Sequence, residues 1–318
     1  MRETDLLIVG AGTAGLTAAI YGCRSGLVCV VLEKGMFGGQ IVNTTDIENY
    51  PGMPGVDGVE FANALHQQAE KLGAQILFES LEEITKGEDH WFYVKTSGGA
   101  FRAKAVIVAN GAEHRKLGCQ GEETFAGRGV SYCATCDGAF YRGKEVAVVG
   151  GGNTALEEAL YLSSICEKVH LIHRRDTFRA HQKTIQRVLS TPNIIPHYQS
   201  AVVRVEGNTK LQSLILSTPE GETTVAVAGL FVAIGLAPQN QLYALLCQLD
   251  ENGYFVAGED CVTSCEGLYA AGDTRQKPLR QLVTAASDGA VAAYMAGSYI
   301  GGTFSQWDAR GSLYQRLF

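Results

Sequence analysis

Residues 6–15 read LLIVGAGTAG, an apolar run that ends in a glycine-rich turn. The apolar run predicts a buried strand, and the spacing of the glycines predicts a tight turn into a helix that reaches about Arg24. A second predicted strand, residues 28–32, ends at Glu33. This order of strand, turn, helix and strand is the βαβ unit of nucleotide-binding folds, in which a pyrophosphate lies at the helix N-terminus.

The same pattern occurs a second time. Residues 146–155 read VAVVGGGNTA, and a predicted helix to about Ile165 leads to a strand at residues 169–172. One glycine fingerprint alone is weak evidence, because short glycine motifs are common. Two copies, each followed at the same interval by a residue that can read a ribose, are strong evidence for two nucleotide-binding units.

The residue after each second strand distinguishes the two nucleotides. The interval from Gly10 to Glu33 equals the interval from Gly150 to His173. The Glu33 carboxylate can accept hydrogen bonds from ribose hydroxyls, which suits a dinucleotide with a free adenosine ribose, such as FAD or NAD. The second copy has no carboxylate there, and its guanidinium groups favour a 2′-phosphate and hence NADP. These groups belong to Arg174, Arg175 and Arg179.

A pair of cysteines precedes the second copy. Cys133 and Cys136 lie in SYCATCD, residues 131–137. Cysteines at this spacing can close an easily reduced disulfide, and their surroundings can lower one thiol pKa enough to make a nucleophile. A zinc site is the alternative, but it needs four ligands and the sequence has no second CxxC. Beside two nucleotide turns, the pair indicates electron transfer between a nicotinamide, a flavin and a disulfide.

The composition narrows the class of protein. At 318 residues the chain is long for one core, so two domains are expected, and 46% hydrophobic with 19% charged residues is typical of a globular protein. The net charge of −7 disfavours nucleic acid or an anionic membrane as partner, and no apolar run is long enough to span a bilayer. Scattered cysteines and a predicted strand that leaves no room for a signal peptide favour a cytoplasmic protein.

The order of the predicted strands indicates one domain inserted into another. Strands that would leave each nucleotide-binding domain end near Gly111 and Gly235. Residues 1–111 and 240–302 are predicted to form the first domain, 112–239 the inserted domain, and 303–318 a C-terminal tail. The predicted fold class is α/β, with two Rossmann-like domains of three ββα layers each. Further strands are expected at 74–78, 91–96, 102–108, 202–206, 211–217, 223–227 and 230–234, and helices over 59–72 and from about residue 280.

Together these motifs resemble those of the low-molecular-weight, bacterial-type thioredoxin reductases, which are class II pyridine nucleotide-disulfide oxidoreductases. The resemblance covers about residues 4–302 and rests on motifs in both predicted domains. They are Gly10-x-Gly12-x-x-Gly15, Gly38-Gly39-Gln40, Cys133-Ala134-Thr135-Cys136-Asp137, Gly150-Gly151-Gly152-Asn153-Thr154-Ala155, His173-Arg174-Arg175, Phe178-Arg179-Ala180, Gly272-Asp273 and Arg280-Gln281.

The resemblance implies a homodimer with one FAD per subunit on the first copy and NADPH on the second. It implies an FAD site made of Gly10, Gly12, Thr13, Ala14, Gly15, Glu33, Gly39, Gln40, Asn49, Gly111, Gly272, Asp273, Arg280, Gln281 and Leu282. It implies an NADPH site made of Arg115, Gly151, Gly152, Asn153, Thr154, Glu158, His173, Arg174, Arg175, Arg179 and Gly235. No metal site is expected.

The resemblance also implies the chemistry. NADPH would reduce FAD, FAD would reduce the Cys133–Cys136 disulfide, and the dithiol would reduce thioredoxin. Cys136 would be the thiol nearer the flavin, and Cys133 the one that attacks the disulfide of thioredoxin. Asp137 is the candidate acid–base for the thiol protons, although it could instead cap the following turn. The family rotates the inserted domain between the two half-reactions, with Gly111 and Gly235 as hinge candidates.

The sequence departs from the family pattern in two places. Asn110 stands where the family usually has threonine, and we expect a small effect on the hinge or on an FAD contact. Residues 303–318 extend past the matched region and include Trp307, Tyr314 and Phe318. These aromatic residues suit either a surface tail, which is the expectation, or a cover over the flavin ring.

Other readings stay open at this point. A related flavin disulfide reductase could serve a glutaredoxin-like protein or a peroxiredoxin, and another variant could draw electrons from ferredoxin. The intact second glycine turn argues against ferredoxin, because such an enzyme needs no 2′-phosphate site. A non-catalytic flavoprotein could instead sense redox state through the CxxC. Cys261 and Cys265 have the spacing of a second redox pair, but we expect them to pack in the core.

Overall fold

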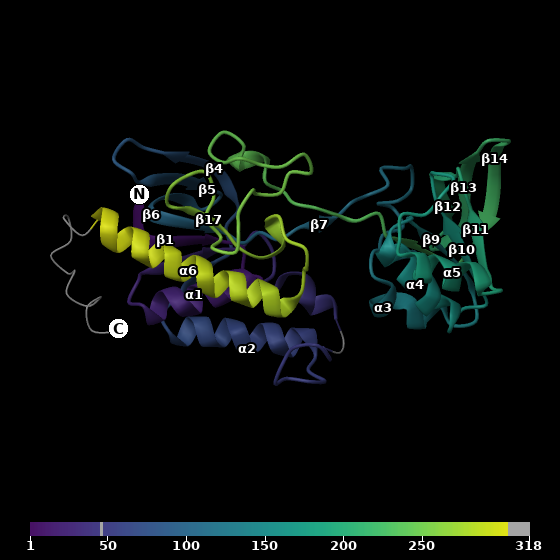
Figure 1. Cartoon of the computed structure of the whole chain (residues 1–318), viewed down its shortest axis with the longest axis horizontal. Coiled ribbons are helices and arrows are strands. Elements are labelled where there is room, and N and C mark those ends of the chain that lie inside the picture. The colour runs from purple at the N-terminus through teal and green to yellow at the C-terminus, as the bar shows by residue number, and fades with distance from the viewer. Residues whose placement is uncertain (45–46, 305–318) are drawn as a thin grey trace. The chain divides into compact units, whose positions relative to one another are not determined.

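The computed structural model describes residues 1–44 and 47–304 (Figure 1). Within it the chain forms two compact units. The first unit contains Met1–Glu113 and the chain from Ala237 onward, and the inserted unit contains His114–Leu236. The boundaries predicted after residues 111 and 239 lie close to these. Among the described residues, no helix has both the length and the apolar character that crossing a bilayer requires.

The first unit is built on a seven-stranded sheet with the order β3-β2-β1-β6-β5-β4, and β17 also pairs with β6. The first four of these strands are parallel, as is β17, whereas β5 and β4 are antiparallel. The long strand β6 pairs with β5 at its beginning and with β17 at its end. The strands are β1 (Arg2–Val9), β2 (Cys29–Leu32), β3 (Gln75–Leu77), β4 (Leu81–Lys86), β5 (Phe92–Thr96), β6 (Gly99–Val108) and β17 (Leu268–Ala270).

Three helices cover one face of this sheet. Figure 1 shows α1 (Thr13–Arg24), α2 (Gly58–Lys71) and α6 (Leu282–Phe304) side by side beneath it. Leu6 and Ile8 of β1 join the apolar cluster on this helical face. Leu7 joins the cluster on the opposite face, with Phe92 and Tyr243. Because both faces are buried there, the second half of β1, residues 6–9, is apolar throughout, which is why the strand could be predicted.

The inserted unit repeats this plan with a five-stranded parallel sheet of order β11-β10-β9-β15-β8. Val148 packs against Leu156 on the helical face, and Val149 packs with Leu216 of an antiparallel three-stranded sheet on the other. Its parallel strands are β8 (Val130–Ser131), β9 (Glu145–Val149), β10 (Lys168–Ile172), β11 (Ile194–His197) and β15 (Gly229–Val232). Its helices are α3 (Ala134–Asp137), α4 (Asn153–Ser163) and α5 (Gln182–Ser190), and its antiparallel strands are β12 (Ala201–Gly207), β13 (Leu211–Thr218) and β14 (Gly221–Ala226).

Short elements complete the chain. The two connections between the units pair as a two-stranded ribbon, β7 (Glu113–His114) with β16 (Leu236–Ala237). Short 3₁₀ helices lie at Gly39–Asn43, Gly138–Tyr141, Gln241–Tyr243 and Gly272–Thr274. The expected tail begins later than predicted, because α6 continues to Phe304. The rest of the predicted tail, with its three aromatic residues, lies outside the described residues.

The elements β4, α5 and β11 were not predicted from the sequence, and neither were the short elements β7, β8, β16 and α3. In β4 few positions are apolar, so the alternating signal is weak. In α5 the apolar residues Ile185, Val188 and Leu189 have helical spacing, but the helix has only nine residues. Pro196 interrupts β11, which is tolerated because β11 is an edge strand of its sheet.

Candidate functional site

The first glycine turn admits no larger side chains at two of its positions. Gly10 has a φ of +104°, and a Cβ there would lie 2.4 Å from the carbonyl oxygen of Ala109. A Cβ on Gly15 would lie 1.8 Å from the carbonyl oxygen of Gly10. Gly12 precedes α1 and offers no side-chain cap to its first N–H groups, and Thr13 and Ala14 form its first, buried turn. This helix end therefore presents free donors suited to an anion.

Glu33 lies where the ribose reader of this unit is expected. One carboxylate oxygen accepts the N–H of Ala11 at 2.8 Å, and the other accepts the N–H of Gly35 at 2.9 Å. These bonds fix the carboxylate beside the glycine turn at the end of β2. Each oxygen has a second lone pair available for a hydroxyl group.

The Gly38-Gly39-Gln40 segment borders the same turn. Gly38 donates its N–H to the carbonyl of Ala11 at 2.7 Å, and Gly39 follows with a φ of +66°. The Gln40 side chain donates to the carbonyl of Ala112. Asn49 donates to the Gln281 side chain at 2.8 Å, so residues from distant parts of the sequence meet here.

Polar atoms in the Gly272-Asp273 turn and just before α6 have no hydrogen-bond partners among the described residues. A Cβ on Gly272 would lie 2.9 Å from the Cβ of Ala14, so the turn approaches α1 closely. Asp273 Oδ1 and Arg280 Nε are buried without hydrogen-bond partners among the described residues. Burial raises the pKa of Asp273. Leu282 begins α6 just beyond. Buried polar atoms are normally paired, so these atoms fit a polar ligand such as a flavin dinucleotide.

A buried charge network holds this turn, and the sequence analysis missed it. Asp288 of α6 takes two hydrogen bonds from Arg275 at 2.8 and 2.9 Å, one from Lys277 at 2.8 Å and one from the Gly272 N–H at 2.8 Å. Burial acts to raise the pKa of Asp288, but its bonds with Arg275 and Lys277 more than offset this and hold it below its usual range. The only signal in the sequence is a lone acid in a long apolar helix.

The second glycine turn is supported by a histidine. A Cβ on Gly151 would lie 2.2 Å from the His173 ring, and His173 bonds the carbonyl of Thr177 at 3.0 Å. His173 is buried, and burial lowers its pKa. Its ring packs against the turn, which requires glycine at position 151. By contrast, a Cβ on Gly152 would meet no atom within 4 Å.

Basic side chains surround the space beside this turn. Arg174 and Arg179 are exposed and Arg175 is half-buried, and none of the three pairs with a carboxylate among the described residues. The Arg179 N–H bonds the Gly151 carbonyl at 2.6 Å, which fixes this segment beside the turn. Asn153 bonds the N–H of His181 at 2.8 Å, and Thr154 is exposed in the first turn of α4. The cations are thus available for an anionic ligand.

The cysteine pair forms a disulfide in the inserted unit. Cys133 and Cys136 are joined at 2.04 Å, and both residues are half-buried. Cys133 caps the short helix α3, because its sulfur accepts the N–H of Cys136 at 3.3 Å. Its own N–H bonds the Ser131 hydroxyl at 3.1 Å. Asp137 ends α3 and its N–H bonds the Cys133 carbonyl at 3.2 Å.

Glu158 lies against this disulfide turn. Its carboxyl group approaches the backbone N–H of Ala134, the residue after Cys133, and its Oε2 is buried without a partner among the described residues. Burial raises the pKa of Glu158 to about 7, although the bond from Ala134 acts in the opposite direction. The sequence analysis assigned this residue to the nucleotide, and the structure places it beside the CxxC turn.

The two connections between the units contain the remaining predicted residues. Gly111 and Gly235 have φ values of +65° and +94°, and a Cβ at either would meet nothing within 4 Å. Arg115 donates its N–H to the Gly235 carbonyl at 2.9 Å and its Nε to the Leu236 carbonyl at 3.1 Å. In the structure Arg115 therefore ties the two connections together.

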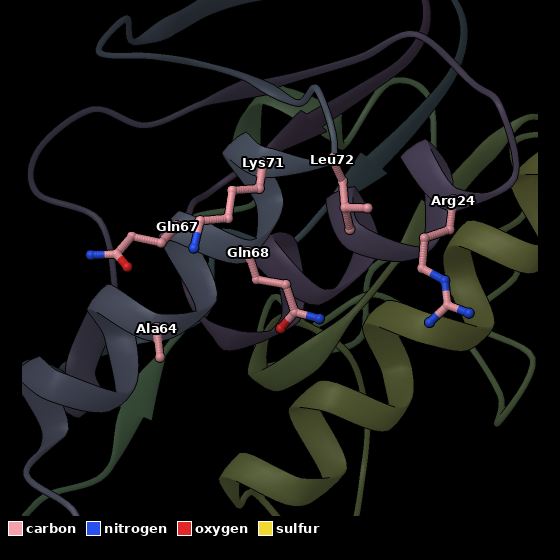
Figure 2. A pocket seen from close by; sticks show the side chains of 6 residues that line it. All are labelled: Arg24, Ala64, Gln67, Gln68, Lys71 and Leu72. Carbon is pink, nitrogen blue, oxygen red and sulfur yellow. The ribbon is translucent and has the colours of Figure 1, made fainter.

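A surface hollow of about 530 Å³ is lined by none of the predicted site residues (Figure 2). It lies between the end of α1 and the outer face of α2 in the first unit, and its lining side chains are exposed. They are Arg24, Ala64, Gln67, Gln68, Lys71 and Leu72. In the part of the chain that the structure describes, no group of three or more His, Cys, Asp or Glu side chains is placed to hold a metal ion.

Comparison with known proteins agrees with this geometry. The family model described as pyridine nucleotide-disulphide oxidoreductase matches residues 4–290. The thioredoxin reductase of Treponema pallidum is 46% identical, covering 94% of this chain and 97% of the relative, and that of Bacillus subtilis is 40% identical over 93% and 94%. The solved thioredoxin reductase of Lactococcus lactis, in its FR conformation, is 39% identical with a TM-score of 0.78, over 93% of this chain and 99% of that one. The chain therefore belongs to the thioredoxin reductases, within the pyridine nucleotide-disulphide oxidoreductase family.

Proposed function

We propose that this protein is an NADPH-dependent, FAD-containing thioredoxin reductase that acts as a cytoplasmic homodimer. The observation that carries the proposal is the Cys133–Cys136 disulfide, half-buried at the start of a short helix in a unit that also has a nucleotide turn. The relatives described above are named thioredoxin reductases, which does not favour a glutaredoxin-like protein or a peroxiredoxin as the substrate.

FAD would lie along the first glycine turn. The free N–H groups at the start of α1 would bind its pyrophosphate, and Glu33 would accept hydrogen bonds from its ribose. Asp273 Oδ1 and Arg280 Nε, buried without protein partners among the described residues, would gain partners from the dinucleotide. Bound FAD supplies the relay of electrons between nicotinamide and disulfide.

NADPH would lie on the second glycine turn. The open space above Gly152 leaves room for its pyrophosphate at the start of α4. Arg174, Arg175 and Arg179 would bind the 2′-phosphate, because guanidinium groups pair with phosphate oxygens. The same cations argue against ferredoxin as the electron donor of this chain. The solved ferredoxin-flavin thioredoxin reductase of Clostridium acetobutylicum is 29% identical to it.

The reduced cysteine pair would then act by thiol–disulfide exchange. The Cys133 thiolate attacks one sulfur of the thioredoxin disulfide, which forms a mixed disulfide and releases the other thioredoxin sulfur as a thiolate. The Cys136 thiolate next attacks the Cys133 sulfur, re-forms the disulfide and releases the second thioredoxin sulfur. Asp137 and Glu158 are the carboxyl groups available to give and take the thiol protons.

Turnover would also need rotation of the inserted unit between the two half-reactions. Gly111 and Gly235, one in each connection, would absorb the change in backbone angles, because both have a positive φ and open space around them.

The test is NADPH oxidation, followed by absorbance, with purified thioredoxin as acceptor and NADH as the parallel donor. We expect turnover with NADPH and little with NADH. The Cys133→Ser variant should lose thioredoxin reduction while NADPH still bleaches the flavin. Cys119 is a half-buried free cysteine of the same unit, and Cys119→Ser should behave as the unchanged protein. Flavin bleaching without thioredoxin turnover in the unchanged protein would refute the substrate. A flavin that NADPH does not reduce would refute NADPH as the donor. Light scattering measures the molecular mass and so tests the homodimer.

A further inference from the structure

Two cysteines outside the active pair lie together in the first unit. Cys247 follows the 3₁₀ helix Gln241–Tyr243, and Cys265 lies in the loop before β17. Both are buried in the same apolar cluster. The Thr263 hydroxyl contacts both residues, since it lies 3.4 Å from the Cys247 sulfur and accepts the Cys265 N–H at 3.2 Å.

This pairing differs from the one that the sequence suggested. The spacing of Cys261 and Cys265 is that of a redox pair, but the Cys261 thiol donates instead to the Asp288 carbonyl at 3.5 Å. Cys261 belongs to the cluster on the helical face of the sheet, whereas Cys265 belongs to the cluster on the opposite face. Cys247 is therefore the neighbour of Cys265.

The environment makes Cys265 the more acidic of the two thiols. Hydrogen bonding between the thiols lowers the pKa of Cys265 to about 7, against burial, and the charge of Lys86 acts in the same direction. The same hydrogen bond, with burial, raises the pKa of Cys247. Burial raises the pKa of Cys261 to about 12, which is the usual behaviour of an inert core thiol.

We propose that Cys247 and Cys265 form a second redox-active dithiol, which hydrogen peroxide closes to a disulfide. The Cys265 thiolate attacks one peroxide oxygen, so that an S–O bond forms, the O–O bond breaks and the leaving hydroxide takes a proton to become water. The Cys247 thiol then loses its proton and attacks the Cys265 sulfur, so that an S–S bond forms and the second water leaves. Two thiols are oxidised by two electrons, and one peroxide is reduced to two waters.

The backbone around the pair is already held together. The Gln248 N–H bonds the Ser264 hydroxyl at 2.7 Å, so the residues next to each cysteine are in contact before any disulfide forms. The loop that contains Cys265 leads through β17 into the Gly272-Asp273 turn. The disulfide would thus join two segments. One contains Cys247 and follows the second connection, and the other contains Cys265 and leads into the Gly272-Asp273 turn. The inference uses neither Cys133 nor Cys136 and does not depend on the electron donor.

The test uses the full-length, FAD-loaded protein. It is reduced with dithiothreitol, freed of reductant, treated with hydrogen peroxide, alkylated with N-ethylmaleimide and digested without reductant. A protease that cleaves after acidic residues separates the two cysteines, because Asp250 and Glu259 lie between them. We expect mass spectrometry to find a disulfide-linked Cys247–Cys265 peptide. Alkylation of Cys265 in the reduced protein should be half-maximal near pH 7.

Variants identify the pair. Cys247→Ala and Cys265→Ala should each abolish the linked peptide and keep NADPH-dependent thioredoxin reduction, and alanine brings no polar group into the cluster. Cys261→Ala is the matched control, since it removes a buried cysteine nearby, and it should keep the linked peptide. Two results would overturn the proposal. They are free Cys247 and Cys265 after peroxide has closed Cys133–Cys136, and a link through Cys261.

Discussion

At the scale of single residues, burial changes the ionisation of Glu158. Its pKa is raised from 4.5 to about 7 by burial, so the folded protein binds this proton more tightly than the unfolded chain does. Stability therefore falls as the pH rises from about 4.5 to 7. We predict that Glu158→Gln removes this fall and is more stable than the unchanged protein above pH 7, by on the order of 2 kcal/mol.

Urea unfolding of the oxidised protein between pH 5 and pH 8 measures this difference. Glu157→Gln is the matched control, because Glu157 is the neighbouring acid on the same helix and is exposed. Its free energy of unfolding should follow that of the unchanged protein. An unaltered slope in Glu158→Gln would mean that the carboxyl group is solvated as in the unfolded chain.

The second glycine turn gives another residue-scale prediction. In Gly151→Ala the new methyl group would meet the His173 ring at 2.2 Å, so the turn or the ring must move. We expect a loss of about 1–3 kcal/mol in stability, as for overpacked cores, and weaker NADPH binding. Gly152→Ala, where the methyl group meets nothing within 4 Å, should keep the stability of the unchanged protein. Equal stability of the two variants, measured by urea unfolding, would contradict this account.

At the scale of elements, α6 and the Gly272-Asp273 turn depend on the charge of Asp288. In Asp288→Asn, Arg275 and Lys277 lose their buried counter-charge, and loss of one partner of a buried ion pair costs about 3–5 kcal/mol. The Gly272 N–H also loses its charged acceptor, because an amide replaces the carboxylate. We therefore predict lower stability by urea unfolding and lower flavin content by absorbance.

Glu259 provides the control for this prediction. It approaches Arg275 at 3.5 Å but its side chain is 90% exposed, so the pair is screened by solvent. Glu259→Gln should change stability by less than about 1 kcal/mol. If the two variants were equally stable, the buried network would not be what holds the turn.

The secondary-structure elements also show how much of the fold could be predicted from the sequence. Both βαβ units were predictable, because the glycine spacing and the apolar strands are local signals. The strand β11 was not, since Pro196 interrupts a short edge strand whose pairing partner comes earlier in the chain. The site beyond the glycine turns depends on long-range contacts. No local pattern announces that Asn49 meets Gln281, that Glu158 approaches Ala134 or that Cys265 faces Cys247.

At the scale of the whole molecule, each unit anchors its own end of the two connections. In the first unit, Asn110 donates to the Gln239 carbonyl at 3.0 Å and accepts the Thr274 hydroxyl at 2.7 Å, and Thr274 also bonds Asn240 at 2.8 Å. In the inserted unit, Arg115 in the first connection donates hydrogen bonds to the carbonyls of Gly235 and Leu236 in the second connection. Asn110 therefore does more than replace the threonine usual at this position, because its side chain joins both connections to the turn at Thr274.

Gly111 lies between these anchors, whereas Gly235 lies at the anchor of the inserted unit, where its carbonyl accepts the Arg115 N–H. The proposed rotation would use the positive φ and the open surroundings of both glycines. An alanine at position 235 would be strained at a φ of +94° by about 1–2 kcal/mol, which narrows the range of backbone angles open to the connection. We predict that Gly235→Ala lowers kcat for thioredoxin reduction while the affinity for NADPH, measured by titration, is unchanged. Gly221→Ala is the control, because Gly221 has a positive φ of +118° and open surroundings but is the first residue of β14, away from the connections. It should carry the same strain and keep full turnover, so an equal loss of kcat in both variants would show that strain alone, and not the position of the glycine, slows the enzyme.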